Sequence, residues 1–304
     1  MTIPNKRRLL LVGATGMLGS AIVEAVLGRS ELSLRALMRP REPDAAAALR
    51  ARGVEIAEGD VMTPSSLPAA VEGVDVVVSA LGNDPHIFVP GHQNLIDAAE
   101  RAGVSRFVPS DFSFDFFKLE ARENFNYAMR KQVAPLFDGR RVRPLHILIG
   151  AFTDTLLDRR APFIDWKNDV LPYFGDGAQP GDFTSVADTA RYVAAACADP
   201  SAPEVLRFAG EVLTMPQFAE AISRGLGRRI EARRQGSLDD LLHLIAEKQR
   251  TAANPFEWLG LQYHHNMVSG RGKLTPLDNA RYPDIQPETV EQCARRTKST
   301  TPEA

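Results

Sequence analysis

The chain has 304 residues, of which 44% are hydrophobic and 24% charged, a composition typical of a globular protein with a sizeable core. The net charge of −2 gives no electrostatic reason to expect binding to nucleic acid or to an anionic membrane. The two cysteines, Cys197 and Cys293, lie far apart in the sequence, which argues against a disulfide scaffold and against a cysteine-based zinc site.

The beginning of the sequence superficially looks like a secretory signal, because the basic residues 6–8 precede the apolar run Leu9–Val12. Glycines at positions 13, 16 and 19 interrupt that run at once, which a secretory signal would not tolerate. No other stretch approaches the roughly 20 apolar residues that a membrane helix needs. We therefore expect a soluble, cytoplasmic protein.

The first half of the chain alternates short apolar runs with helical patterns. Apolar spacing predicts helices that begin near residue 17, over 44–52 and over 95–102. Strands are predicted at residues 9–12, 32–38, 54–57, 74–79, 106–108 and 146–149. Strands that are apolar on both faces and alternate with helices indicate a parallel sheet covered on both sides. Residues 1–150 are therefore predicted to form a Rossmann domain, a doubly wound α/β fold.

The pattern changes after residue 150, where prolines and glycines separate shorter elements. We expect residues 151–304 to form a smaller α+β substrate region, interleaved with the Rossmann sheet around 184–210. The helices predicted here span 186–198, with Ser185 and Asp188 in a capping-box pattern, a stretch after Thr214, and 238–250; a strand is expected at 205–208. The polar tail from residue 295 is expected to be frayed. An aromatic cluster over 256–263 could line a substrate pocket, and it could equally be core or a subunit contact.

The segment G-A-T-G-M-L-G, Gly13–Gly19, lies between a predicted strand and a predicted helix, the context that a dinucleotide-binding fingerprint requires. Its first glycine permits a tight turn, its second lets backbone amides approach a pyrophosphate, and its third permits close helix packing. The helix N-terminus supplies unpaired N–H groups to the phosphates. We assign to this site Gly13, Thr15, Gly16, Met17, Leu18 and Gly19. The alternative is a glycine-rich turn that binds no ligand.

The second strand ends in Met38-Arg39-Pro40-Arg41, without the carboxylate that NAD-specific folds place there to bind the ribose hydroxyls. Guanidinium groups suit a 2′-phosphate, because they form paired, charge-assisted hydrogen bonds with it. Arg39 is therefore predicted as the main phosphate ligand and Arg41 as a second one, which favours NADP(H) over NAD(H). The alternative is that both are solvent-exposed surface arginines, and Glu42 could still reach a ribose.

Two further strand ends are expected to border the cofactor. Asp60 ends the third strand and could accept a hydrogen bond from the adenine amine; a turn-capping role is the alternative. The small residues around Ala80 and Leu81 end the fourth strand and would let the backbone pass close to the cofactor.

Taken together, these motifs resemble the NmrA-like and isoflavone-reductase-like atypical short-chain dehydrogenases. The resemblance also rests on Arg106–Phe112, which reads RFVPSDF, on Gly150–Phe152, and on a continuation through Thr184–Tyr192. It implies a Rossmann domain with a smaller C-terminal substrate region. It also implies that Ser110–Phe112 and Gly150–Phe152 border the nicotinamide end, which makes Ser110 and Phe152 cofactor-binding candidates. The family includes NADPH-dependent reductases of aromatic natural products and nucleotide-sensing regulators without turnover.

The resemblance implies a catalytic lysine on the helix after RFVPSDF, at a position that falls near Ala128 in this sequence. The nearest lysine is Lys131, which forms a Y-x-x-x-K pair with Tyr127 on one helix face. The pair resembles that of ordinary short-chain dehydrogenases, in which the tyrosine donates a proton while the lysine favours its phenolate form and holds the ribose. We take Tyr127 and Lys131 as the candidate catalytic pair; the alternative is a packed tyrosine beside a surface lysine.

Two functions follow from this sequence. The first is an NADPH-dependent oxidoreductase that reduces a carbonyl or enone carbon of a small, apolar or aromatic substrate. The second is a non-catalytic NADP(H) sensor that acts through a protein partner, which the absence of a lysine at position 128 favours. The six histidines show no metal-binding spacing, so no metal is expected. A monomer and a homodimer are both compatible with the sequence.

Overall fold

The computed structural model describes residues 6–254 and 256–300. Contacts between residues divide the chain into two compact units. Unit 1 contains Met1–Phe112, Ala128–Ile147 and Thr189–Leu206, and unit 2 contains Ser113–Tyr127, Leu148–Asp188 and Arg207–Ala304.

Unit 1 is built on a six-stranded sheet in which every neighbouring pair is parallel. Its strand order is β3-β2-β1-β4-β5-β6, that is Glu55–Glu58, Leu32–Met38, Arg7–Val12, Val76–Ser79, Arg106–Val108 and Arg143–Pro144. The chain leaves β1 in one direction for β2 and β3 and then continues on the other side of β1 with β4. This reversal is the topological switch point of a doubly wound sheet, and it confirms the predicted fold class.

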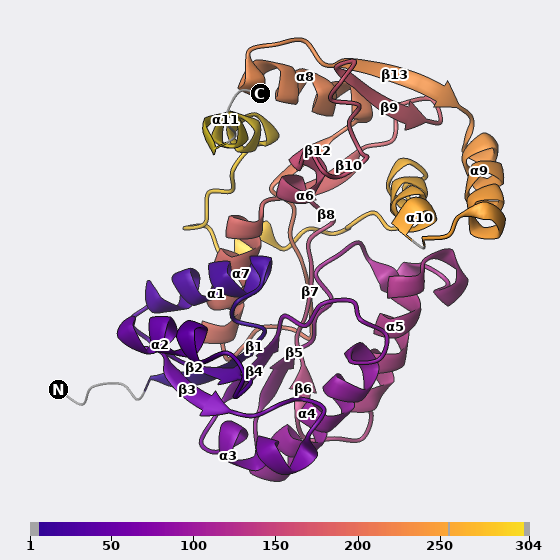
Figure 1. Ribbon diagram of the computed structural model, residues 1–304. Coiled ribbons are helices and arrows are strands. Elements are labelled where there is room, and N and C mark those ends of the chain that lie inside the picture. The colour runs from indigo at the N-terminus through magenta and orange to yellow at the C-terminus, as the bar shows by residue number, and fades with distance from the viewer. Residues whose placement is uncertain (1–5, 255, 301–304) are drawn as a thin grey trace. The chain divides into compact units, whose positions relative to one another are not determined.

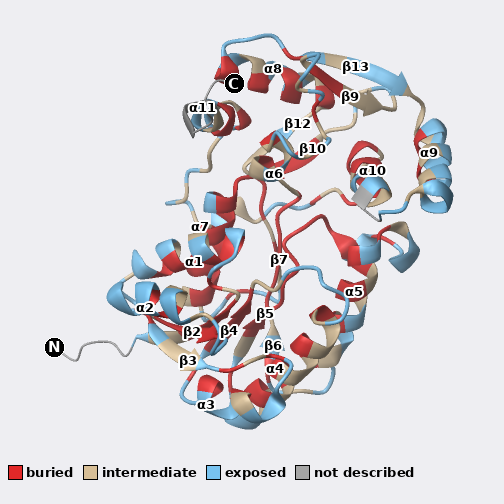
Figure 2. Ribbon diagram, viewed as in Figure 1, coloured by how far each residue is buried: buried red, intermediate tan, exposed pale blue. Residues whose placement is uncertain are grey.

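Helices cover both faces of this sheet (Figure 1). One face carries α1 (Met17–Leu27), α2 (Pro43–Ala51) and α7 (Val186–Ala198), and the other carries α3 (Leu67–Val71), α4 (Phe88–Ala102) and α5 (Phe125–Val133). Apolar side chains of β1, β4 and β5 are fully buried between these layers, as the red strands of Figure 2 show. Burial on both faces explains why these strands read as continuous apolar runs in the sequence.

Unit 2 contains two small sheets. One has the order β12-β10-β8, formed by Glu211–Leu213, Gly181–Thr184 and Ala151–Phe152; in the other, β9 (Val170–Phe174) pairs in parallel with β13 (Glu231–Gly236). Its helices are α6 (Thr153–Leu157), α8 (Met215–Leu226), α9 (Leu238–Thr251), α10 (Phe256–Val268) and α11 (Val290–Thr300). A further ladder joins β7 (His146–Leu148) to β11 (Val205–Arg207).

Two predicted helix boundaries are wrong. The helix expected from residue 95 begins at Phe88, because Pro90 and Gly91 lie in its first turn, where proline needs no N–H partner. The tail expected to be frayed from residue 295 is helical to Thr300. Its buried residue Ala294 packs against α8 so closely that a Cβ on Gly225 would lie 2.7 Å from the Ala294 Cβ. Residues 301–304 of that tail lie outside the described residues.

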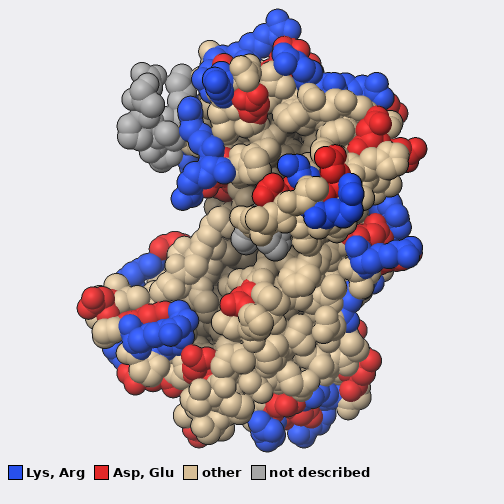
Figure 3. Space-filling model, turned by 45° about the vertical axis from the view of Figure 1, so that its right-hand side comes forward, with Lys and Arg blue, Asp and Glu red and all other residues tan. Residues whose placement is uncertain are grey.

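Charged side chains are mixed on the surface. On the face shown in Figure 3, Lys and Arg alternate with Asp and Glu in small groups, so this face carries no large patch of one sign. Among the described residues, no helix combines the length and apolar character needed to cross a bilayer. Cys197 and Cys293 are buried free thiols, and burial raises the pKa of each to about 12.

Candidate functional site

The glycine loop joins β1 to α1, and two of its glycines are required by the packing of the chain itself. Gly13 has φ +83°, and a Cβ there would lie 2.6 Å from the Ala80 carbonyl oxygen. A Cβ on Gly19 would lie 1.9 Å from the Gly13 carbonyl oxygen. The first and third glycines therefore let β1, β4 and α1 approach one another closely.

Gly16 differs from both, because the fold does not demand a glycine there. Its backbone is extended, with φ −75°, and a Cβ would meet only the Gly13 carbonyl oxygen, at an ordinary 3.4 Å. Thr15, Gly16 and Met17 are exposed, whereas Leu18 and Gly19 are buried. The space beside Gly16 is therefore open to a group from outside the chain.

The N-terminus of α1 begins at Met17, directly after Gly16. No side chain caps this end within the described residues, and its first turn contains no acidic residue. Helix N-termini leave backbone N–H groups without helical partners and carry a partial positive charge. This end of α1, next to the open side of Gly16, can therefore bind an anionic group such as a diphosphate.

Arg39 and Arg41 follow the last residue of β2, as predicted, and both side chains are exposed. The Arg39 guanidinium contacts the Glu42 carboxylate, a neighbour that the sequence analysis considered only as a ribose ligand. Arg41 forms no ion pair within the described residues, so it is available to an anionic ligand.

Asp60 lies in the turn after β3. Its Oδ1 accepts a hydrogen bond from the Met62 N–H at 2.8 Å, and its own N–H donates to the Ser66 hydroxyl at 3.0 Å. These contacts match the turn-capping alternative; the second carboxylate oxygen makes no hydrogen bond among the described residues. At the end of β4, the Ala80 N–H donates to the Val12 carbonyl at 2.9 Å, which fixes the β4 end beside the glycine loop.

Ser110 is buried at the exit of β5 and makes two contacts in unit 1. Its hydroxyl donates to the Leu81 carbonyl at 2.8 Å, and its N–H donates to His92 Nε2 at 3.3 Å. The other ring nitrogen of His92 lies 2.6 Å from the Phe88 carbonyl, so Nδ1 carries the proton and Nε2 is the acceptor. Burial lowers the pKa of His92 to about 4, which keeps the ring neutral at physiological pH.

The residue after Ser110 is held in a similar way. Asp111 Oδ2 lies 2.5 Å from Nδ1 of His146 in β7, and both side chains are buried. The sequence analysis did not find His92 or this contact. The position of His92 on the apolar face of α4, with Phe88 and Leu95, was the available signal for its burial.

The candidate catalytic pair lies on α5, which contributes residues to both units. The Tyr127 ring is fully buried in unit 2 and packs edge-on against Tyr263, with ring centroids 5.4 Å apart. Lys131 is half-buried in unit 1. Phe152, in β8, and Tyr127 belong to unit 2, whereas the glycine loop, Arg39, Asp60, Ala80, Leu81 and Ser110 belong to unit 1.

The aromatic cluster predicted over 256–263 is described only in part, because Pro255 and the side chain of Phe256 lie outside the described residues. Within it, the Tyr263 hydroxyl accepts a hydrogen bond from Asn126 Nδ2 at 2.9 Å, and its ring lies 6.4 Å from that of Phe114. Phe114, Tyr127 and Tyr263 therefore form an aromatic group within unit 2.

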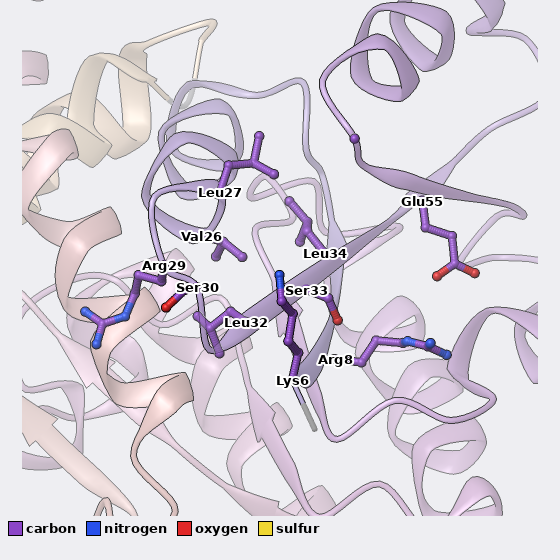
Figure 4. Close-up of a pocket in the computed structure, with 11 residues that line it drawn as sticks. Lys6, Arg8, Val26, Leu27, Arg29, Ser30, Leu32, Ser33, Leu34 and Glu55 are labelled. Atoms are coloured by element: carbon purple, nitrogen blue, oxygen red, sulfur yellow. The ribbon is translucent and has the colours of Figure 1, made fainter. Parts of the chain in front are cut away.

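A separate pocket of about 340 Å³ lies in unit 1 at the amino-terminal ends of β1 and β2. Figure 4 shows Lys6, Arg8 and Arg29 around it, together with apolar residues from the end of α1 and the start of β2. The glycine loop follows the opposite, carboxyl-terminal end of β1, where ligands of doubly wound sheets bind, so this pocket is distinct from the candidate site. Among the described residues, no group of three or more His, Cys, Asp or Glu side chains could hold a metal ion.

Comparison with known proteins shows what this chain is similar to. Residues 5–134 match the profile of the NmrA-like family, over a segment that contains the glycine loop, Arg39, Asp60 and RFVPSDF. Over this segment, which is less than half of its length, the chain is similar to the NmrA-like family. It is 25% identical over 264 residues to the isoflavone reductase homolog A622-like of Nicotiana tabacum, a match that covers 81% of this chain and 83% of the relative.

Solved structures share the fold across nearly the whole chain. A structure described as AtPrR2 with NADP+ and (+)pinoresinol has a TM-score of 0.81 at 22% identity, covering 96% of this chain and 99% of that one. The binary complex of leucoanthocyanidin reductase and NADPH from Vitis vinifera has a TM-score of 0.81 at 20% identity, covering 96% and 100%. The NmrA-like profile itself ends at residue 134, before most of unit 2. Ala128, where the resemblance to the family's reductases expects a lysine, lies in α5 and is half-buried.

Proposed function

We propose that this protein is an NADPH-dependent oxidoreductase that reduces a small, apolar or aromatic carbonyl or enone substrate. The observation that carries the proposal is the glycine loop: Gly16 leaves open space that the fold does not need, directly beside the uncapped N-terminus of α1. The comparisons support it, because relatives that match over most of the chain are named as isoflavone reductases or isoflavone reductase homologs, and two similar structures contain NADP+ or NADPH.

In this proposal each part of the cofactor has assigned residues. The glycine loop, from Gly13 through Thr15, Gly16, Met17 and Leu18 to Gly19, binds the pyrophosphate with backbone N–H groups. Arg39, with Arg41 beside it, binds the 2′-phosphate, and the remaining oxygen of Asp60 faces the adenine. The backbone around Ala80, Leu81 and Ser110 borders the nicotinamide end. When bound, NADPH supplies the hydride.

The proton would come from the chain. We assign it to the Tyr127 hydroxyl, which donates to the oxygen or carbon that becomes electron-rich as the substrate is reduced. Lys131, one helical turn further on α5, favours loss of that proton through its positive charge. The edge-on packing of Tyr127 against Tyr263 fixes the phenol ring, and an aromatic substrate would pack against the same group in unit 2.

Gly16→Ala tests the cofactor site without damaging the fold. A methyl group at position 16 causes no clash within the chain, but it would occupy the space assigned to the pyrophosphate. Calorimetric titration should show NADPH binding at least tenfold weaker, with the unfolding temperature unchanged. Gly28→Ala is the matched control at the other end of α1, where a Cβ lies no closer than 3.6 Å to its neighbours. NADPH binding that is equal in the two variants would contradict the proposal.

A second function, an NADP(H) sensor without turnover, is favoured by one feature of the sequence: the resemblance implies a catalytic lysine near Ala128, and this chain has none at that position. Following NADPH absorbance with a panel of aromatic enones and aldehydes separates the two functions. Oxidation of NADPH that depends on a substrate supports the reductase. Tight NADPH binding without oxidation by any member of the panel supports the sensor.

A further inference from the structure

We propose that Glu42 sets the affinity of the site for the 2′-phosphate, because it holds the Arg39 guanidinium whenever no phosphate is bound. This inference rests on the proposed function, in which Arg39 is the main 2′-phosphate ligand. It assigns to Glu42 the role of a competing anion within the site.

The backbone brings these two residues together independently of their charges. Arg39 and Glu42 are the first and last residues of a tight turn, in which the Glu42 N–H donates to the Arg39 carbonyl at 3.0 Å. Pro40 occupies the second position of the turn, where its fixed φ favours this geometry. The side chains at the two ends of the turn are thereby neighbours, and the guanidinium contacts the Glu42 Oε1 atom.

The Glu42 carboxylate has no other function in the described structure that would explain its position. Glu42 immediately precedes α2, yet its side chain does not cap the N-terminus of that helix. Its hydrogen bond goes to Arg39. The carboxylate is therefore available as an exchangeable partner of the guanidinium.

A carboxylate and a phosphate compete for the same guanidinium N–H groups, because each can accept two parallel hydrogen bonds along one edge of the planar group. The Arg39 and Glu42 side chains are 43% and 26% exposed, so solvent screens their attraction and a phosphate can displace the carboxylate. Each NADPH molecule that binds must nevertheless break this contact. NADH lacks the 2′-phosphate and leaves the contact intact, so Glu42 should affect the affinity for NADPH alone.

The test is calorimetric titration of NADPH and NADH into the wild-type protein and into Glu42→Gln, Glu42→Ala, Arg39→Ala and the Arg39→Ala/Glu42→Gln double variant. Both Glu42 variants should bind NADPH about two- to fivefold more tightly, the range expected for release of an exposed ion pair, with NADH binding unchanged. In the Arg39→Ala background the same substitution should give less than half of this gain.

Glu31→Gln is the matched control. Glu31 lies just before β2, at the opposite end of that strand from Arg39, and forms an ion pair with Arg29 at 2.7 Å, in which the two side chains are 47% and 36% exposed. It removes the same charge without touching the site and should leave both affinities unchanged.

The outcomes separate this inference from the proposed function. If Arg39→Ala weakens NADPH binding but the Glu42 variants do not strengthen it, Glu42 does not compete and only this inference fails. A gain of equal size with and without Arg39 would mean that Glu42 repels the phosphate directly, which also overturns it. Weaker NADH binding in the Glu42 variants would show that Glu42 binds the ribose instead. If NADPH does not bind to the wild-type protein, the proposed function itself fails.

Discussion

Asp111 Oδ2 and His146 Nδ1 lie 2.5 Å apart in the buried interior of unit 1, although 35 residues separate them in the sequence. The preceding residue, Ser110, donates its N–H to a second buried histidine, His92. Two consecutive residues of the RFVPSDF segment are thus held by histidines from two different elements, β7 and α4. This arrangement fixes the exit of β5, where the proposed site needs a rigid wall.

Breaking the Asp111–His146 pair should destabilise the protein. Replacing one member alone, as in Asp111→Leu or His146→Leu, leaves its buried partner without this contact and should cost about 3 kcal/mol. The double variant should lose clearly less than the sum of the two single losses, because it leaves neither group behind. Urea unfolding of the three variants measures this coupling. If the loss in the double variant equals the sum of the two single losses, the interaction between Asp111 and His146 does not contribute to stability.

Substitution by alanine should destabilise the protein at Gly19 but not at Gly16. Gly19→Ala places a methyl group 1.9 Å from the Gly13 carbonyl oxygen, so backbone must move and the free energy of unfolding should fall by about 3 kcal/mol or more. Gly16→Ala should leave the free energy of unfolding within about 0.5 kcal/mol of the wild type. Thermal denaturation distinguishes the two variants. A large loss of unfolding free energy in Gly16→Ala would mean that Gly16 is required for folding, so that its role in cofactor binding could not be tested separately.

Substitutions of the candidate catalytic pair should reduce turnover without abolishing cofactor binding. Tyr127→Phe removes the proposed proton donor and should lower kcat by about 10² to 10⁴-fold, the usual contribution of a positioned acid. Lys131→Ala should lower kcat less and shift its pH dependence, because the lysine acts through the tyrosine. Lys248→Ala is the control, because Lys248 is a half-buried lysine of α9 that pairs with Glu257 in unit 2 and has no role in the proposed mechanism. Unchanged turnover in both test variants would remove the assignment of Tyr127 and Lys131.

Stability should fall as the solution becomes mildly acidic. Burial, with a smaller effect of the neighbouring His265, lowers the pKa of His264 from 6.5 to about 4. Between these values the unfolded chain binds a proton that the folded protein does not, so stability is lost as pH falls from 6.5 towards 4. His264 lies between Phe163 and Phe174, an environment that suits an aromatic replacement.

His264→Phe should therefore lose about 2 kcal/mol less than the wild type between pH 7 and pH 5, as measured by urea unfolding at the two pH values. His92, which the variant retains, contributes in the same direction. His243→Gln, on the exposed surface of α9, should behave as the wild type does. An unchanged pH dependence in His264→Phe would show that folding does not lower the pKa of this histidine.

Elements whose residues follow a local pattern of apolar side chains or glycines are predictable from the sequence. The run Leu32–Met38 and the segment Arg106–Val108 form strands at the predicted residues, because most of their side chains are apolar and buried. The spacing of Gly13, Gly16 and Gly19 predicts the glycine loop, because all three lie in the short segment that connects β1 to α1 or begins that helix. The helix at Val290–Thr300 was missed, because its stability comes from packing against α8 and its own composition is polar.

Contacts between distant residues could not be read from the sequence. Nothing in the spacing of Asp111 and His146 indicates that β5 and β7 bring them together. The position of Arg39 was predicted, but its contact with Glu42 depends on the turn at Pro40, and a side-chain pair of this kind leaves no periodic pattern. The roles of Lys131 and Tyr127 remain predictions from the helix that they share.

The path of the chain between the two units determines which truncated forms of the protein keep the contacts of unit 1. After residue 112 the chain returns to unit 1 twice, over Ala128–Ile147 and Thr189–Leu206. The second return carries the Cys197 carbonyl that accepts from Arg7 at 2.7 Å and the Ala202 carbonyl that accepts from Arg106. A truncation after residue 150 would keep all six parallel strands and still strip both guanidinium groups of these acceptors. During synthesis, Arg7 and Arg106 of the sheet can therefore form these hydrogen bonds only after the segment Thr189–Leu206 has left the ribosome.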